Sequence, residues 1–150
     1  MSDVDQARKQ IETAIDSFNQ QNYRAAILSA GCAEEILEGV LHARELQTRL
    51  ENLARAISNL HEADSGESPE ETRDWILAPL RRLKQNPDAG IPDAQEKAKD
   101  FIERSLYDYS ETNGPETEAM QEFWEKHFAG RPNALVDGAD FQGEGFDRSQ

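Results

Sequence analysis

Two pairs of carboxylates in this sequence have the spacing that a metal site on helices needs. Glu35 and Glu38 stand three residues apart, and so do Glu71 and Asp74, so each pair shares one face of a helix. Carboxylate oxygens are the ligands that Mg²⁺ prefers. Four such side chains converging inside a helical bundle would form a site for Mg²⁺.

The same carboxylates also fit a solvated acidic face. The chain of 150 residues carries 30 Asp and Glu residues, so pairs at this spacing arise easily by chance. Glu71 would also place negative charge in the first turn of a helix, where the helix dipole favours it. The two pairs loosely resemble the E-x-x-E and E-x-x-D pairs of all-helical nucleotide pyrophosphohydrolases, which implies a Mg²⁺-dependent hydrolase as an alternative. Our leading expectation is that the chain binds no metal and no other cofactor.

A third set of ligand-type side chains recurs every four residues: Glu34, Glu38 and His42. Carboxylates and imidazoles both bind metals, but three ligands on a single helix are an incomplete site. We therefore expect a stripe that faces water. Cys32 lies nearby in a run of small residues, with no basic or histidine neighbour in sequence, which favours core packing over a reactive thiol.

The elements that must position these residues are helices. Apolar residues recur at spacings of three and four along most of the chain, whereas the alternation typical of strands is missing. The segment from Tyr23 to Arg44 is rich in small residues between Ala25 and Ala33. Small residues let a neighbouring helix approach closely, so this segment should be the central helix. Helices are expected over residues 4–20, 23–44, 46–61, 69–85, 94–112 and 115–129.

The fourth of these helices has a clear start and a predicted break. Ser68 can cap it, Pro69 suits its first turn, and Glu71 completes a capping box. Pro79 should bend or interrupt the helix, because proline lacks the backbone N–H and clashes with the preceding turn. Trp75 is expected on its buried face, although aromatic residues could instead form a dimer face.

The start signals and the composition of the C-terminal third complete the expected fold. Asp93 with Glu96 repeats the capping pattern, and Pro115 should open the last helix. Beyond residue 129 the chain is polar, contains several glycines and has no helical period. We expect an all-α fold, an antiparallel bundle of five to six helices over residues 1–129, with an irregular tail over residues 130–150 that is extended or partly disordered.

The formal net charge of −14 limits the partners. Free nucleic acid and anionic membranes should be repelled, since binding a polyanion needs a basic patch. A protein partner, including a basic one, fits the charge. The sequence has one cysteine, no apolar run long enough to cross a membrane and no signal-peptide pattern at its start, so we expect a cytoplasmic protein.

The first two expected helices resemble the helical pair of HEPN-like proteins. Ala14, Ile15 and Phe18 precede a short polar turn, and the run YRAAILSAGCAEEIL then extends from Tyr23 to Leu37. The run is most similar to that of uncharacterised bacterial proteins with an "AGAAEEILG"-like helix. The resemblance implies an antiparallel helical bundle that is often dimeric. Many members of that family are ribonucleases with an Arg-x4–6-His motif, so the resemblance also implies a search for that motif here.

Arg55 and His61 have the spacing that this motif implies. In such a site the histidine would act as general acid or base, and the arginine would stabilise the charge that develops on the phosphate. However, Ala56 stands where the family has a polar residue, and the pair lies earlier in the chain than the family motif. We therefore expect the nuclease site to be absent or degenerate, with both residues on a charged helix surface.

Three functional classes follow. The leading hypothesis is a non-enzymatic, HEPN-like protein that acts through protein–protein interaction, as a homodimer or with another protein. The first alternative is an enzyme, either a divergent HEPN ribonuclease or a Mg²⁺-dependent nucleotide hydrolase. The second alternative is an acidic mimic of nucleic acid that occupies a nucleic-acid-binding protein.

Overall fold

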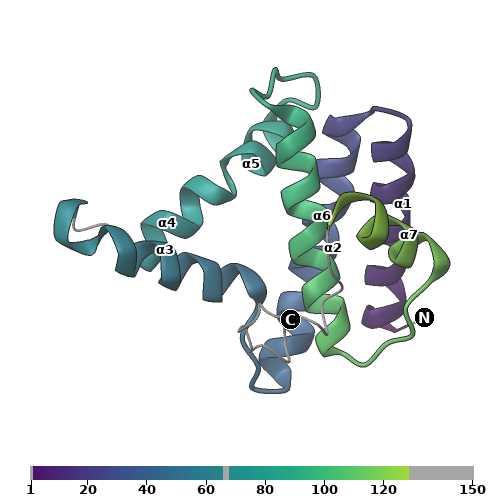
Figure 1. Cartoon of the computed structure of the whole chain (residues 1–150), viewed down its shortest axis with the longest axis horizontal. Helices are drawn as coiled ribbons and strands as arrows, with labels where there is room; N and C mark the ends of the chain where they lie inside the picture. The colour runs from purple at the N-terminus through teal and green to yellow at the C-terminus, as the bar shows by residue number, and fades with distance from the viewer. Residues whose placement is uncertain (1, 66–67, 129–150) are drawn as a thin grey trace. The chain divides into compact units, whose positions relative to one another are not determined.

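The computed structural model describes residues 2–65 and 68–128, apart from the side chains of residues 61–65, so the expected tail lies outside the described residues. Helices and no strand form in this part of the chain, which confirms the all-α fold class (Figure 1). No described helix combines the length and the apolar character needed to cross a lipid bilayer. The helices are α1 (Asp3–Asn19), α2 (Tyr23–Ala43), α3 (Arg49–Ser65), α4 (Pro69–Ile76), α5 (Ala78–Gln85), α6 (Ala94–Glu111) and α7 (Glu118–His127).

The chain divides into two compact units after Gly114. The first unit contains α1 to α6, and the second contains α7. The prediction that Pro115 opens the last helix is wrong, because α7 begins at Glu118. Its cap is Thr117, whose side chain accepts a hydrogen bond from the backbone N–H of Met120 and so satisfies a donor that the first turn would leave free.

The central helix of the first unit is α2, as its small residues predicted. It packs against α1 and α6 and also contacts α5. Ala26, Ala30 and Ala33 are fully buried. A Cβ atom at Gly31 would lie 2.5 Å from the side chain of Leu80 on α5, so the glycine allows α5 to approach α2 closely. This close approach forms one wall of the site described below.

The predicted break near Pro79 divides one expected helix into α4 and α5. The first ends at Ile76 and the second begins at Ala78. The N–H of Leu77 still donates to the carbonyl of Arg73 at 3.0 Å, but Pro79 has no N–H with which to continue the ladder. The break brings the number of described helices to seven.

Apolar side chains on α1 and α6 are buried as their spacing predicted, with Ile11 and Phe101 among the largest. The predicted cap of α6, however, is wrong. Asp93 has a φ of 53° and a ψ of 45°, and its side chain makes no capping hydrogen bond. A capping side chain reaches the first turn from an extended backbone, and the left-handed conformation of Asp93 directs it elsewhere.

Candidate functional site

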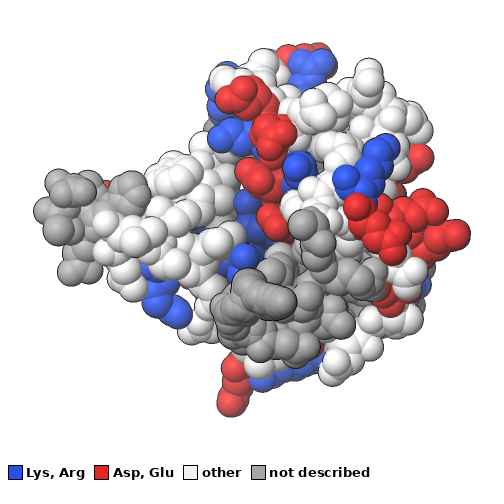
Figure 2. Space-filling view, in the orientation of Figure 1, with Lys and Arg blue, Asp and Glu red and all other residues white. Residues whose placement is uncertain are grey.

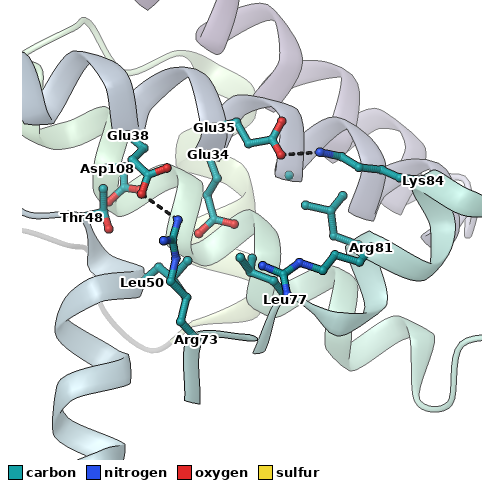
Figure 3. Close-up of a pocket in the computed structure, with 12 residues that line it drawn as sticks. Glu34, Glu35, Glu38, Thr48, Leu50, Arg73, Leu77, Arg81, Lys84 and Asp108 are labelled. Carbon is teal, nitrogen blue, oxygen red and sulfur yellow. Dashed lines mark hydrogen bonds and ion pairs between the residues drawn. The ribbon is translucent and has the colours of Figure 1, made fainter. Parts of the chain in front are cut away.

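A cleft of about 180 Å³ opens between α2 on one side and α4 and α5 on the other (Figure 3). Carboxylates come mainly from α2, and the cationic side chains come from α4 and α5. Leucines from α5 and the α4–α5 junction form apolar parts of the wall. The ionisable side chains of the lining are Glu34, Glu35, Glu38, Arg73, Arg81, Lys84 and Asp108.

Two of the four carboxylates that suggested a Mg²⁺ site line this cleft, and each has a cation of its own. Glu35 forms an ion pair with Lys84. Glu38 accepts a hydrogen bond from Nη2 of Arg73 at 2.7 Å. Both cations come from the opposite wall, so these pairs hold α4 and α5 against α2.

The other two carboxylates, Glu71 and Asp74, do not line the cleft. Glu71 completes the predicted capping box: its carboxylate accepts from the N–H of Ser68 at 2.9 Å, while its own N–H donates to the Ser68 hydroxyl at 3.2 Å. Asp74 pairs with Arg81 at 3.1 Å. The structure therefore divides the four carboxylates among separate contacts and does not bring them together around one point.

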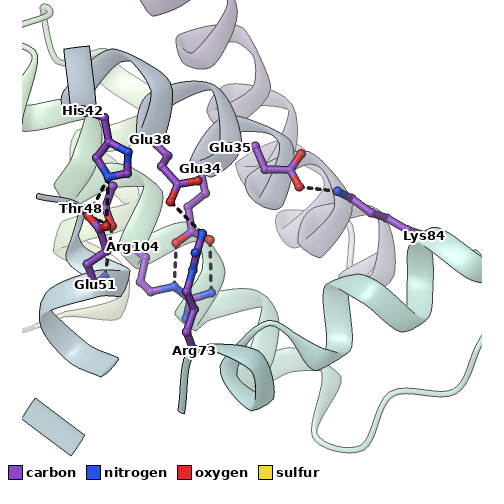
Figure 4. A network of polar contacts seen from close by, with 9 residues as sticks. All are labelled: Glu34, Glu35, Glu38, His42, Thr48, Glu51, Arg73, Lys84 and Arg104. Carbon is purple, nitrogen blue, oxygen red and sulfur yellow. Dashed lines mark hydrogen bonds and ion pairs between the residues drawn. The ribbon is translucent and has the colours of Figure 1, made fainter. Parts of the chain in front are cut away.

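Glu34 is the most deeply buried acid of α2, and its predicted place on a water-facing stripe is wrong. Its residue surface is 6% exposed. It accepts two hydrogen bonds from Arg104 of α6, at 2.8 Å from Nε and 3.3 Å from Nη2 (Figure 4). Burial raises the pKa of Glu34, and the neighbouring Arg104 guanidinium opposes that rise.

Asp108 of α6 is buried at the end of the cleft opposite Lys84 (Figure 3). Its residue surface is 1% exposed. Oδ1 accepts a hydrogen bond from the backbone N–H of Arg49 at 2.7 Å, whereas Oδ2 has no hydrogen-bond partner among the described residues. Burial raises the pKa of Asp108 to about 7; the Arg49 hydrogen bond opposes this rise, and the nearby Glu34 adds to it.

Glu38, His42 and Glu51 are the described residues whose grouping fits a metal ion, with ligand atoms within 4.8 Å of one another. Nε2 of His42 lies 3.0 Å from both carboxylate oxygens of Glu51 (Figure 4). Glu51 also accepts from the N–H of Thr48 at 2.8 Å, which makes it part of the cap at the start of α3. Because Arg73 holds Glu38, a metal would have to displace existing contacts of all three ligands.

Arg55 and position 61 both lie on α3. Six residues along a regular helix turn through about 600°, so the two positions point about 120° apart around the axis. Arg55 is exposed, and the side chain of His61 lies outside the described residues. The backbone therefore does not place the two on a common helix face.

A second concave surface lies between the α3–α4 pair and α6, with a volume of about 310 Å³. Trp75, which lines it, is 50% exposed, and Leu60, one turn beyond Ile57 on α3, is 79% exposed. The prediction that Trp75 is buried is therefore wrong. Figure 2 shows that the visible face over α3 and α4 carries few charges. We call this surface the apolar groove. It is lined by Leu53 and Ile57 of α3, Trp75 and Ile76 of α4, and Lys97, Asp100, Phe101, Glu103 and Arg104 of α6.

Sequence reasoning missed Arg104 and Asp108. A signal was present in the spacing. Arg104 stands three residues and Asp108 seven residues after Phe101, so both share its buried helix face. A charged residue at a core position of a helix predicts a buried partner or a binding site. By contrast, Cys32, which was predicted in the core, is partly exposed.

Comparisons with protein families, characterised proteins and solved structures found no match for this chain.

Proposed function

We propose that this chain is a non-enzymatic, HEPN-like protein that acts by protein–protein association, and that its apolar groove pairs with a second copy of the chain. The observation that carries the proposal is the half-exposed Trp75 beside the groove. Tryptophan offers a large apolar area and is enriched at the energetic centres of interfaces. Covering it would remove apolar surface from water.

Charge supports a second copy as the occupant. Two molecules with a formal net charge of −14 each repel one another least where their surfaces carry the fewest charges. The face over α3 and α4 is such a surface (Figure 2). The α6 side of the groove carries balanced charge from Lys97, Asp100, Glu103 and Arg104.

Shape supports the same partner. Leu60 is 79% exposed and stands three residues after Ile57 of the groove lining, on the same helix. A two-fold dimer brings the same patch of both copies together. The projecting leucine of each copy can then enter the groove of the other.

The HEPN-like part of the proposal is supported by α1 and α2, which pack against each other. Ala14, Ile15 and Phe18 on α1, which carry part of the resemblance, are all buried. The non-enzymatic part is supported by the pairing of Glu35 and Glu38 with cations. A cytoplasmic location is part of the same proposal, supported by the single cysteine of the sequence.

Sedimentation equilibrium over a range of protein concentrations tests the association. The wild-type chain should form dimers at micromolar concentrations. Trp75→Glu and Leu60→Glu should each weaken the dimer at least about tenfold, or ~1.4 kcal/mol. The matched control is Leu46→Glu, because Leu46 is also exposed, by 37%, and does not line the groove.

Two outcomes would contradict the proposal. One is a wild-type chain that stays monomeric at every concentration. The other is a dimer that Trp75→Glu and Leu46→Glu weaken equally, with circular dichroism showing both variants folded. Either result would show that the exposed Trp75 side chain does not mediate self-association.

A further inference from the structure

The charges that line the cleft between α2 and α4–α5 are matched almost completely. Glu34 pairs with Arg104, Glu35 with Lys84, Glu38 with Arg73, and Arg81 with Asp74. Each of these pairs joins one carboxylate to one cation. Among the described ionisable side chains of the lining, Asp108 is left without an ion-pair partner.

The unmatched group is also the most deeply buried carboxylate of the lining. Asp108, a residue of the cleft lining, is 1% exposed, and its Oδ2 atom has no hydrogen-bond partner among the described residues. A carboxylate that is buried without a counter-charge is costly to keep ionised. Its raised pKa of about 7 is the expected sign of that cost. A ligand that places a cation beside the carboxylate would offset this cost of ionisation.

We propose that the cleft binds a small organic cation whose ammonium or guanidinium group donates a hydrogen bond to Oδ2 of Asp108. The apolar parts of the lining, Leu50, Leu77 and Leu80, suit a short alkyl chain on that cation. The volume of about 180 Å³ limits the ligand to a few non-hydrogen atoms, below the size range of ordinary drug sites.

A second polar atom refines the ligand class. Nε of Arg73 is buried and has no hydrogen-bond partner among the described residues, while Nη2 of the same side chain is held by Glu38. Nε is a donor only. A ligand that carries an acceptor oxygen besides its cationic group, such as a short amino alcohol, would satisfy both unpartnered atoms.

The test uses ethanolamine as the probe and ethylene glycol as its neutral analogue. Each is titrated into the full-length protein at pH 8, where Asp108 is largely ionised, while NMR follows the amide of Arg49 and the carboxyl carbon of Asp108. Ethanolamine should shift both signals in a saturable manner at millimolar concentrations. It should also lower the pKa of Asp108, because a bound cation favours the ionised carboxylate. Ethylene glycol should do neither.

Three variants locate the site. Asp108→Asn keeps an oxygen for the Arg49 N–H and should weaken ethanolamine binding at least tenfold. Leu77→Trp narrows the cleft from its apolar wall while Asp108 itself is unchanged, and it should also weaken binding, which keeps the test valid if Asp108→Asn folds poorly. Asp5→Asn, which breaks a partly exposed ion pair on α1 outside the cleft lining, should leave the affinity within about twofold.

The proposal is overturned if ethanolamine leaves the Arg49 and Asp108 signals unchanged, if ethylene glycol binds equally well, or if folded Asp108→Asn binds ethanolamine with unchanged affinity. Saturable binding of Mg²⁺ that excludes ethanolamine would also overturn it, since the unmatched carboxylate would then serve a metal. None of these results bears on self-association through the apolar groove.

Discussion

The Glu34 carboxylate of α2 and the Arg104 guanidinium of α6 face each other through two hydrogen bonds in the interior, at 2.8 and 3.3 Å. Their side chains are 7% and 5% exposed. The pair joins two of the four long helices of the first unit, α2 and α6. It also supplies the charged background against which Asp108 titrates, since Glu34 raises the pKa of Asp108 and Arg104 lowers it.

Breaking this pair from one side should destabilise the fold strongly. Arg104→Met leaves the Glu34 carboxylate buried without a counter-charge, so the free energy of unfolding should fall by about 3–5 kcal/mol. Urea denaturation at pH 7 measures the change. Lys84→Met is the control, because it breaks the half-exposed pair with Glu35 and should cost less than about 1 kcal/mol. Equal losses in the two variants would contradict a special role for burial.

Replacing both partners should be far milder. Glu34→Leu combined with Arg104→Met removes two buried charges and substitutes side chains of comparable size, a change that is often neutral in other proteins. We expect the double variant to recover most of the stability lost in Arg104→Met, measured by the same denaturation. A double variant as unstable as the single one would show that packing at these positions, and not the ion pair, dominates.

Asp108 should make the fold less stable as the pH rises. Its folded pKa of about 7 is above the value of 3.8 for a free side chain. The folded state therefore binds more protons than the unfolded state between these values, so the stability contribution of the protonated group is lost as the pH rises toward 7. Asp108→Asn should remove this loss. The variant should gain stability over the wild type between pH 5 and pH 8, as thermal denaturation at each pH would show. A difference that does not vary with pH would contradict the raised pKa.

His42 should titrate above its ordinary pKa because of Glu51. The hydrogen bond to the Glu51 carboxylate raises the pKa of His42, and the ion pair thus contributes stability at low pH that is lost as the pH rises through the folded pKa. Glu51→Gln should lower the His42 pKa, which an NMR titration of the imidazole protons measures. Glu45 is an exposed acid that bonds the His42 carbonyl through its own backbone N–H, at 3.0 Å, and a change of its side chain keeps that bond. Glu45→Gln should therefore leave the pKa of His42 unchanged.

Two glycines of α2 should respond differently to alanine. Gly39 has open space around its Cβ position, so Gly39→Ala should stabilise the helix by about 1 kcal/mol. At Gly31 the new methyl group would meet Leu80 at 2.5 Å and push α5 outward. Gly31→Ala should therefore gain less stability than Gly39→Ala, or lose some. Equal gains in chemical denaturation would show that α5 yields without cost.

Helical periodicity was enough to predict the fold class, the central position of α2 and the break at Pro79. These depend on local spacing and on backbone chemistry, which the sequence carries directly. The cap of α6 failed because the left-handed backbone of Asp93 is set by the preceding loop. The prediction for Trp75 failed because an apolar helix position is buried only where another element covers it. Among the described residues, half of the Trp75 surface is left uncovered.

The site was harder to predict than the fold. Glu34 and Asp108 are 74 positions apart in number, and nothing local indicates that they share one cleft. The carboxylates of α2 that suggested a metal site, Glu35 and Glu38, have cations across the cleft, and these become visible only when α4 and α5 dock on α2. Ion pairs between distant segments depend on the fold. A search for motifs within single helices therefore overestimates the number of carboxylates that are free to bind a metal.

The wall of the cleft that faces α2 consists of α4 and α5, each only eight residues long. Helices of this length are marginal by themselves and depend on their docking contacts. Their amide hydrogens should therefore exchange with solvent faster than those of α2 and α6, through local opening that leaves the rest of the unit folded. A cation bound at Asp108 would slow this exchange selectively. Binding would therefore be detected as slower amide exchange in α4 and α5, with little change in α2 and α6.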